Sequence, residues 1–137
     1  MSHRYREAQS AICTQNSSFV FDLSPGEYHA NVVLASLAGR AAILHAGSFA
    51  DPEVPAAIEA LYPGRVLRLS DEEKAAFAAN AIALGEDEVW MSSGAAASLR
   101  PENRERLAAW GFRLRTVALD EIEKAGGSLR CCVAEEF

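Results

Sequence analysis

Short apolar runs alternate with charged, helix-like stretches along most of the chain. These short runs are typical of β-strands, and the run at 112–117 alternates apolar with polar positions. Ala38-Gly39 lies between two of them and predicts a hairpin turn, although alanine is a weaker turn former than asparagine in such a pair. We expect strands at residues 18–23, 31–37, 40–45, 65–69, 89–91, 112–117 and 129–134.

Helices are predicted between these strands. Asp51-Pro52-Glu53 opens one with a capping residue, a proline in the first turn and an acidic residue, and Tyr62-Pro63-Gly64 ends it. Ser70 and Glu73 form a capping-box pattern, which predicts a helix that continues through residue 83. We also expect a helix at 100–110 and a helical turn at 120–124. The sequence therefore predicts a mixed α/β fold, with residues 18–137 as a single domain behind a frayed N-terminal segment at 1–17.

Length and charge narrow the function. A chain of 137 residues fits one domain with a real core. Its net charge of −6 argues against binding to nucleic acid or to acidic membranes, because phosphate contacts need clustered Lys and Arg. No apolar run approaches the roughly 20 residues that span a bilayer, and the first residues lack the apolar core of a secretory signal. We expect a cytoplasmic protein.

The cysteines are the first candidates for chemistry. Cys13, Cys131 and Cys132 show neither a disulfide framework nor the spacing of a zinc site. Gly126-Gly127 precedes the adjacent pair, and a cysteine after such a bend can act as a nucleophile. The same pattern also suits two small buried residues at the start of a strand. A thiol redox protein is disfavoured, since there is no Cys-x-x-Cys.

A cysteine nucleophile usually works with a histidine. His29 lies where a loop meets a predicted strand, a common place for functional side chains. His45 follows an apolar run and reads as a strand-end or core residue. Asn80 is a polar residue in an alanine-rich stretch, which we interpret as structural. Acidic residues at 120, 121 and 123 could meet a guanidinium, but a solvated helix face is the favoured explanation for them.

Three segments together resemble the C-terminal half of the guanidino-modifying enzymes of the pentein superfamily. This superfamily includes dimethylarginine dimethylaminohydrolases, arginine deiminases and amidinotransferases. The terminal segment, with its two adjacent cysteines, is most similar to the dimethylaminohydrolase branch. The segments are Tyr28-His29-Ala30-Asn31-Val32-Val33, Phe77-Ala78-Ala79-Asn80-Ala81-Ile82, and 120–132 with its end Gly126-Gly127-Ser128-Leu129-Arg130-Cys131-Cys132.

The resemblance implies roles for individual residues. Cys131 matches the nucleophile that attacks the guanidino carbon, and His29 matches the acid/base that protonates the leaving amine and then activates water. Asn31 and Arg130 are expected beside the substrate, while Cys132 is expected to point away into the sheet. The implied reaction converts an N-methylated arginine to citrulline and an alkylamine through a thiouronium intermediate, without a cofactor or a metal.

The resemblance also has gaps. The family fold is a five-bladed α/β propeller of strand–helix modules, so only about half of the modules fit in this chain, as mixed sheets with peripheral helices. Asn31 stands where many relatives carry an aspartate, and the carboxylates of the other half have no match. We therefore expect a homo-oligomer or a companion chain to complete the site, unless the half is a remnant. The alternatives are a non-catalytic half-subunit, or a deiminase-type or amidinotransferase-type activity.

Overall fold

Two modules with the same topology make up most of the molecule. The structure, a computed structural model, describes residues 11–14 and 17–136. Each module is a three-stranded sheet in which an antiparallel hairpin is followed by a helical crossover and a parallel third strand. The first module consists of β3 (Leu34–Leu37), β4 (Ala41–Leu44), α2 (Glu53–Leu61) and β5 (Val66–Arg68). The second consists of β6 (Ile82–Leu84), β7 (Glu88–Ser92), α4 (Ser93–Ser98), α5 (Pro101–Ala109) and β8 (Arg113–Val117).

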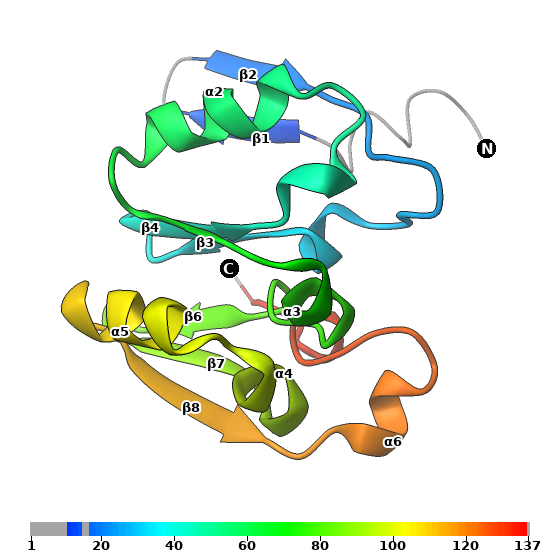
Figure 1. Ribbon diagram of the computed structural model, residues 1–137, viewed down its shortest axis with the longest axis vertical. Coiled ribbons are helices and arrows are strands. Elements are labelled where there is room, and N and C mark those ends of the chain that lie inside the picture. Colours follow the sequence, from blue (N-terminus) through cyan, green and yellow to red (C-terminus); the bar gives the residue numbers. More distant parts are fainter. Residues whose placement is uncertain (1–10, 15–16, 137) are drawn as a thin grey trace.

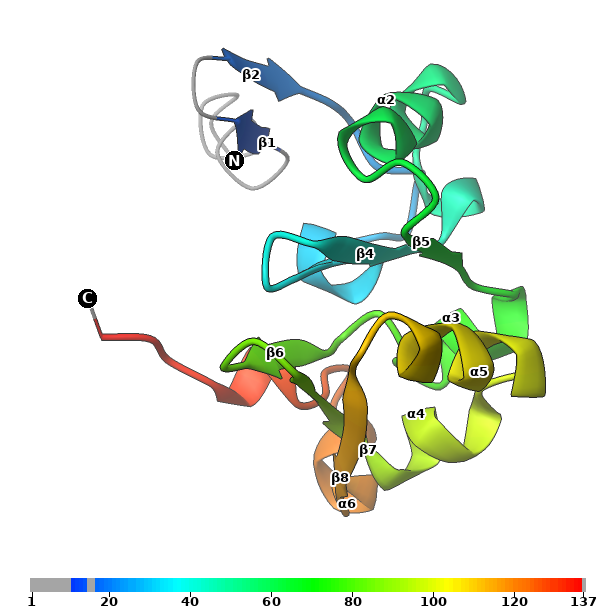
Figure 2. The same ribbon diagram turned by 90° about the vertical axis from the view of Figure 1, so that its left-hand side faces the viewer.

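The modules stack on each other along a seam where β3 and β6 are in contact (Figure 1). Helix α3 (Asp71–Ala75) connects them, and α6 (Asp120–Glu123) and the 3-10 helix η3 (Arg130–Cys132) follow the second module. Figure 2 shows the C-terminal segment leaving on the side opposite α4 and α5. The 3-10 helices η1 (Ala30–Val32) and η2 (Ala46–Ser48) flank the first hairpin, and β1 (Ala11–Thr14) pairs with β2 (Ser17–Val20).

One hydrophobic core joins the two modules. Leu37, Ile43 and Leu67 from the first module pack in the same cluster as Met91 and Leu107 from the second. Each of these side chains is at most 1% exposed. Burial of one such side chain stabilises the fold by about 2 kcal/mol. Separation of the modules would expose several of them at once, so its free-energy cost would be several times larger. The seam is therefore a fixed part of the structure.

Several predicted elements are confirmed at close to their predicted positions. Ala38 and Gly39 both have positive φ angles, 53° and 66°, as the two-residue hairpin turn requires. Asp51 Oδ1 accepts a hydrogen bond from the Glu53 amide at 2.9 Å just before α2, but the N-cap position of this helix is Pro52 and not the predicted Asp51. Ser70 and Glu73 form the predicted capping box at the start of α3.

The helix predicted to continue through residue 83 is wrong. Helix α3 ends at Ala75, and Phe77 adopts a left-handed conformation with φ of 67°. The Ala78 amide bonds to the Glu73 carbonyl and the Phe77 amide to the Lys74 carbonyl, both at 3.0 Å. This pattern is a Schellman C-cap, which usually carries glycine at the left-handed position. With phenylalanine at this position, no glycine marks the end of α3, so the sequence does not predict that strand β6 follows.

The strand predicted at 129–134 is also wrong, because this segment contains η3. The backbone amides of Arg130 and Cys131 bond to Asn80 and not to a neighbouring strand. Two other predictions need smaller corrections. The strand predicted at 31–37 begins with η1, and the one predicted at 18–23 is β2 followed by a single bridge from Leu23 to Phe49. Helix α4, capped by Ser92, was not predicted.

Residues 1–10 of the segment predicted to fray lie outside the described residues, whereas Ala11–Thr14 is strand β1. Within the described part of the chain, no helix is both long enough and apolar enough to cross a membrane.

A buried carboxylate ties the connection between the modules together. Glu73 is 0% exposed and accepts hydrogen bonds from the Arg100 amide at 3.0 Å, from Arg100 Nε at 2.9 Å and from Asn103 Nδ2 at 3.0 Å. Burial by itself would raise the pKa of Glu73. The hydrogen bonds from Ser70, Arg100 and Asn103 outweigh it, so this pKa lies below its ordinary value.

Replacement of this carboxylate should make stability less dependent on pH. Since the Glu73 pKa is lowered by folding, the unfolded chain takes up the proton first as the pH falls, and the stabilisation is lost. Glu73→Gln should reduce the free energy of unfolding by about 2 kcal/mol at neutral pH. At acid pH the unsubstituted protein loses the stabilisation from ionised Glu73, so the free energies of unfolding of the two proteins should become more similar. Urea unfolding at several pH values measures this, with the exposed neighbour Glu72→Gln as the control. A difference that stays constant down to acid pH would contradict it.

Candidate active site

The side chain of Asn80 is the centre of the candidate site. It is 0% exposed and lies just before β6, in the loop that follows the C-cap of α3. Its Nδ2 donates to the Asn31 carbonyl at 2.8 Å and to Cys131 Sγ at 3.3 Å. Its Oδ1 accepts from the Ser128 amide at 3.2 Å and from the Cys131 amide at 3.3 Å. This one amide therefore joins three segments that are far apart in the sequence.

Cys131 lies within η3 with its thiol exposed. Its Sγ accepts a hydrogen bond from Asn80 Nδ2. The same sulfur lies 3.8 Å from Asn31 Oδ1, to which the thiol can donate a hydrogen bond. A Cβ added at Gly127 would lie 3.4 Å from both Cβ and Sγ of Cys131. Glycine at 127 thus lets the backbone run close to the thiol. The sulfur is accessible and has polar partners, as a nucleophile requires.

His29 and Asn31 lie on the same segment, around η1. His29 is exposed, and its ring contacts that of Tyr28 at 5.2 Å between centroids. Among the described residues, no hydrogen bond joins His29 to Cys131. The structure thus brings Asn31 into contact with the thiol and holds His29 two residues earlier in the chain.

Tyr28 belongs to the site and was not singled out by sequence reasoning. Burial raises the pKa of the Tyr28 hydroxyl, and electrostatic interactions with Cys131 and Glu27 raise it further. Tyr28 is therefore within electrostatic range of the sulfur while its side chain is 50% exposed. Its position directly before His29 was the only signal available in the sequence.

The loop that carries Tyr28 and His29 is anchored by Glu27. This carboxylate pairs with Lys74 of α3 and accepts from Ser48 Oγ at 3.1 Å. Ser48 is bonded in turn to His45 Nδ1 at 2.7 Å, and His45 Nε2 to Asp71 at 2.7 Å. His45, at the end of β4, is thus a structural residue, as its position after an apolar run suggested.

Arg130 lines a cavity of about 270 Å³ together with Asn31. Its guanidinium donates to the Val133 carbonyl at 3.0 Å and lies 3.5 Å from Glu135. Cys132 is exposed, so the expectation that it points into a sheet is wrong, because no strand forms at this position. Of the acidic residues before the glycine pair, Glu123 accepts from Ser128 Oγ at 2.7 Å and supports the bend.

Within the described part of the chain, no group of three or more His, Cys, Asp or Glu side chains is placed so that it could bind a metal ion.

Comparison with known proteins identifies relatives of this arrangement. A family model described as "N,N dimethylarginine dimethylhydrolase, eukaryotic" matches residues 13–137. No curated protein matches the chain. Among solved structures, apo ArgZ, an arginine dihydrolase from the ornithine–ammonia cycle in cyanobacteria, is 27% identical with a TM-score of 0.64. The alignment covers 76% of this chain and 15% of that one.

Two further structures extend the comparison. The product-bound N-terminal domain of ArgZ is 27% identical with a TM-score of 0.65, over 76% of this chain and 36% of that one. SxtG, an amidinotransferase from Microseira wollei, is 17% identical with a TM-score of 0.60, over 82% of this chain and 32% of that one, and shares the fold. This chain therefore spans only a minor part of the structures that it matches.

These findings confirm the resemblance to the pentein superfamily and the predicted fold class. The two mixed sheets with flanking helices form an open α/β arrangement, as expected for part of such a propeller. By the match over residues 13–137, the chain belongs to the eukaryotic N,N dimethylarginine dimethylhydrolase family.

Proposed function

We propose that this chain carries the nucleophile and the acid/base of a hydrolase that acts on N-methylated arginine. The observation that carries the proposal is the Asn80 side chain, which binds the amide and the sulfur of Cys131 and the carbonyl of Asn31. A cationic guanidino group beside the sulfur would favour the thiolate, so binding of the substrate helps to form the nucleophile.

In the first step, the Cys131 thiolate adds to the guanidino carbon and forms a C–S bond. The C–N bond to the methylated nitrogen then breaks, and protonated His29 gives its proton to the leaving amine. The result is a thiouronium cation on Cys131 and a neutral His29. In the second step, water gives a proton to His29 and adds to the same carbon. The C–S bond breaks, the thiolate returns, the ureido product releases a proton to solvent as citrulline, and the amine takes up a proton.

Asn31 and Arg130 are proposed to position the substrate. Asn31 Oδ1 faces the sulfur at 3.8 Å and can accept a hydrogen bond from a guanidino N–H. Arg130 lines the same cavity as Asn31, and its guanidinium suits the planar carboxylate of an amino acid. Its contact with Glu135, at 3.5 Å, is long enough to be exchanged for the substrate carboxylate.

The site needs an additional negatively charged group to bind a guanidinium cation. Among the described residues, no carboxylate contacts the Cys131 sulfur, and a guanidinium that leaves water needs a negative partner. We propose that a second copy of the chain or a companion segment supplies it. Leu84 of β6 and Val117 of β8 are exposed on edge strands, which are suited to pairing with another surface.

Turnover by the isolated chain tests the nucleophile. Citrulline formation from arginine and methylated arginines should be lost in Cys131→Ser, since serine lacks a comparable nucleophile here, and should persist in Cys132→Ser. Agmatine belongs in the panel with ammonia as its readout, because it cannot yield citrulline. Turnover that survives in Cys131→Ser would refute the assignment of the nucleophile. Absence of turnover from the folded chain would show that it cannot complete the site without a partner.

Self-association is tested separately. A chain of 14.7 kDa should give at least twice this mass by light scattering at micromolar concentration, because the open modules expose sheet edges and apolar side chains. A monomer under these conditions would contradict assembly from identical copies and leave a companion chain or an incomplete remnant.

A further inference from the structure

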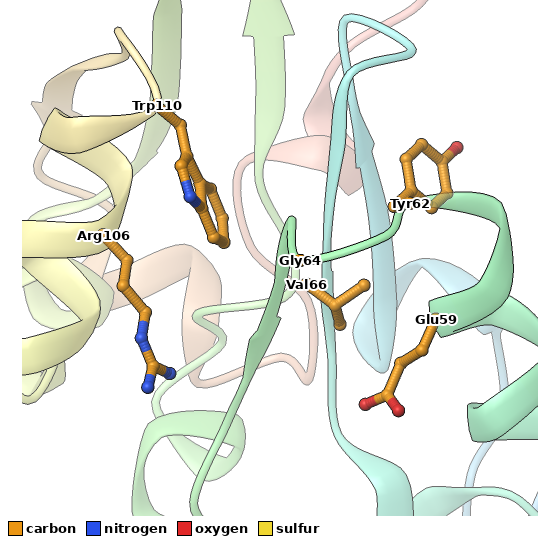
Figure 3. Close-up of a pocket in the computed structure, with 6 residues that line it drawn as sticks. All are labelled: Glu59, Tyr62, Gly64, Val66, Arg106 and Trp110. Carbon is orange, nitrogen blue, oxygen red and sulfur yellow. The ribbon is translucent and has the colours of Figure 1, made fainter.

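A second cavity lies on the seam between the modules and shares no lining residue with the Cys131 site. Its volume is about 410 Å³, within the range of small-molecule sites. Figure 3 shows side chains of α2 and of the turn that follows it on one wall, and side chains of α5 and its C-cap on the other. The lining residues are Glu59, Tyr62, Gly64, Val66, Arg106 and Trp110.

Opposite charges face each other across this cavity. The Arg106 guanidinium extends from α5, and within the described part of the chain it makes no side-chain hydrogen bond or ion pair. Glu59 lies on the facing wall (Figure 3), where Arg68 binds its Oε1 from outside the cavity. No ion pair joins Arg106 to Glu59 among the described residues. The cavity thus offers a guanidinium without a partner and a carboxylate that is held in place.

The remaining wall is apolar and fixed from behind. The Tyr62 hydroxyl is hydrogen-bonded to Ser36 Oγ at 2.9 Å, and the Trp110 carbonyl accepts from Arg40 Nη1 at 3.1 Å. Val66 of β5 lies between the two aromatic residues (Figure 3). The first contact holds the Tyr62 ring and the second holds the backbone of Trp110 before anything binds, so a ligand would lose less free energy in ordering this wall.

We propose that this cavity binds a zwitterionic α-amino acid with an apolar side chain. A guanidinium presents two parallel N–H donors that match a carboxylate, so the α-carboxylate would lie on Arg106. The α-ammonium would face Glu59, and the side chain would pack on Trp110, Tyr62 and Val66. A simple anion would leave the Glu59 carboxylate without a positive partner inside the cavity, which favours the zwitterion. The site is independent of the proposed hydrolase activity.

The two tryptophans of the chain provide the measurement. Their indole N–H groups give two resolved signals in an ¹⁵N correlation spectrum, and Trp110→Phe assigns them. L-leucine should shift the Trp110 signal and saturate it at about millimolar concentration. The Trp90 signal should not move, since Trp90 lies on β7 beside Arg115. Leucinamide, without the carboxylate, and 4-methylpentanoate, without the ammonium, should each bind about tenfold more weakly.

Variants of the charged walls complete the test. Arg106→Gln and Glu59→Gln should each weaken leucine binding by about tenfold, while the rest of the spectrum stays unchanged and reports an intact fold. Arg113→Gln is the matched control, because Arg113 is exposed and lies outside the cavity. The proposal is overturned if Trp110 shows no saturable shift up to about 10 mM leucine. It is equally overturned if leucinamide binds as well as leucine, or if Arg113→Gln has the same effect as Arg106→Gln.

Discussion

The buried amide of Asn80 holds the candidate site together. An asparagine side chain offers two donors and two acceptor positions, and Asn80 makes four hydrogen bonds with them, to Asn31, Ser128 and Cys131. Each partner lies on a segment without regular strand pairing, so its polar groups would otherwise lack a partner when folded. Loss of this amide would leave the backbone N–H of the buried residue Ser128 without this acceptor, at a cost of about 1–3 kcal/mol. The geometry around the thiol therefore depends on one residue that does not itself react.

The seam between the modules supplies the rigidity that both proposed sites need. The shared core fixes the first module against the second, and the Glu73 network fixes the connection between them. The Cys131 site is built from segments that lie just before each module and after the second one. The 410 Å³ cavity uses the helices of both modules. Tyr62 also lines a smaller cavity of about 230 Å³ that is lined by Asn31 as well.

Local signals in the sequence predicted much of the fold, and long-range contacts account for the errors. The hairpin at Ala38-Gly39 and the capping box at Ser70 depend on neighbours in the chain, so the sequence predicts them directly. The end of α3 depends on a left-handed phenylalanine, which no local rule favours. The conformation around Cys131 depends on hydrogen bonds with a residue 51 positions away. Asn80 was noticed as a polar residue among alanines, but its contact with the thiol became visible only in three dimensions.

The adjacent cysteines allow the central claim to be tested within one molecule. Cys131 and Cys132 are both exposed. Within the described part of the chain, the Cys131 sulfur accepts a hydrogen bond from the Asn80 side chain and the Cys132 sulfur does not. Brief alkylation with iodoacetamide at neutral pH, followed by fragmentation of the C-terminal peptide in a mass spectrometer, gives the rate at each sulfur. The account predicts faster modification of Cys131, and loss of this preference in Asn80→Asp, where a donor becomes an acceptor. Equal rates at both sulfurs, or a preference for Cys132, would contradict it.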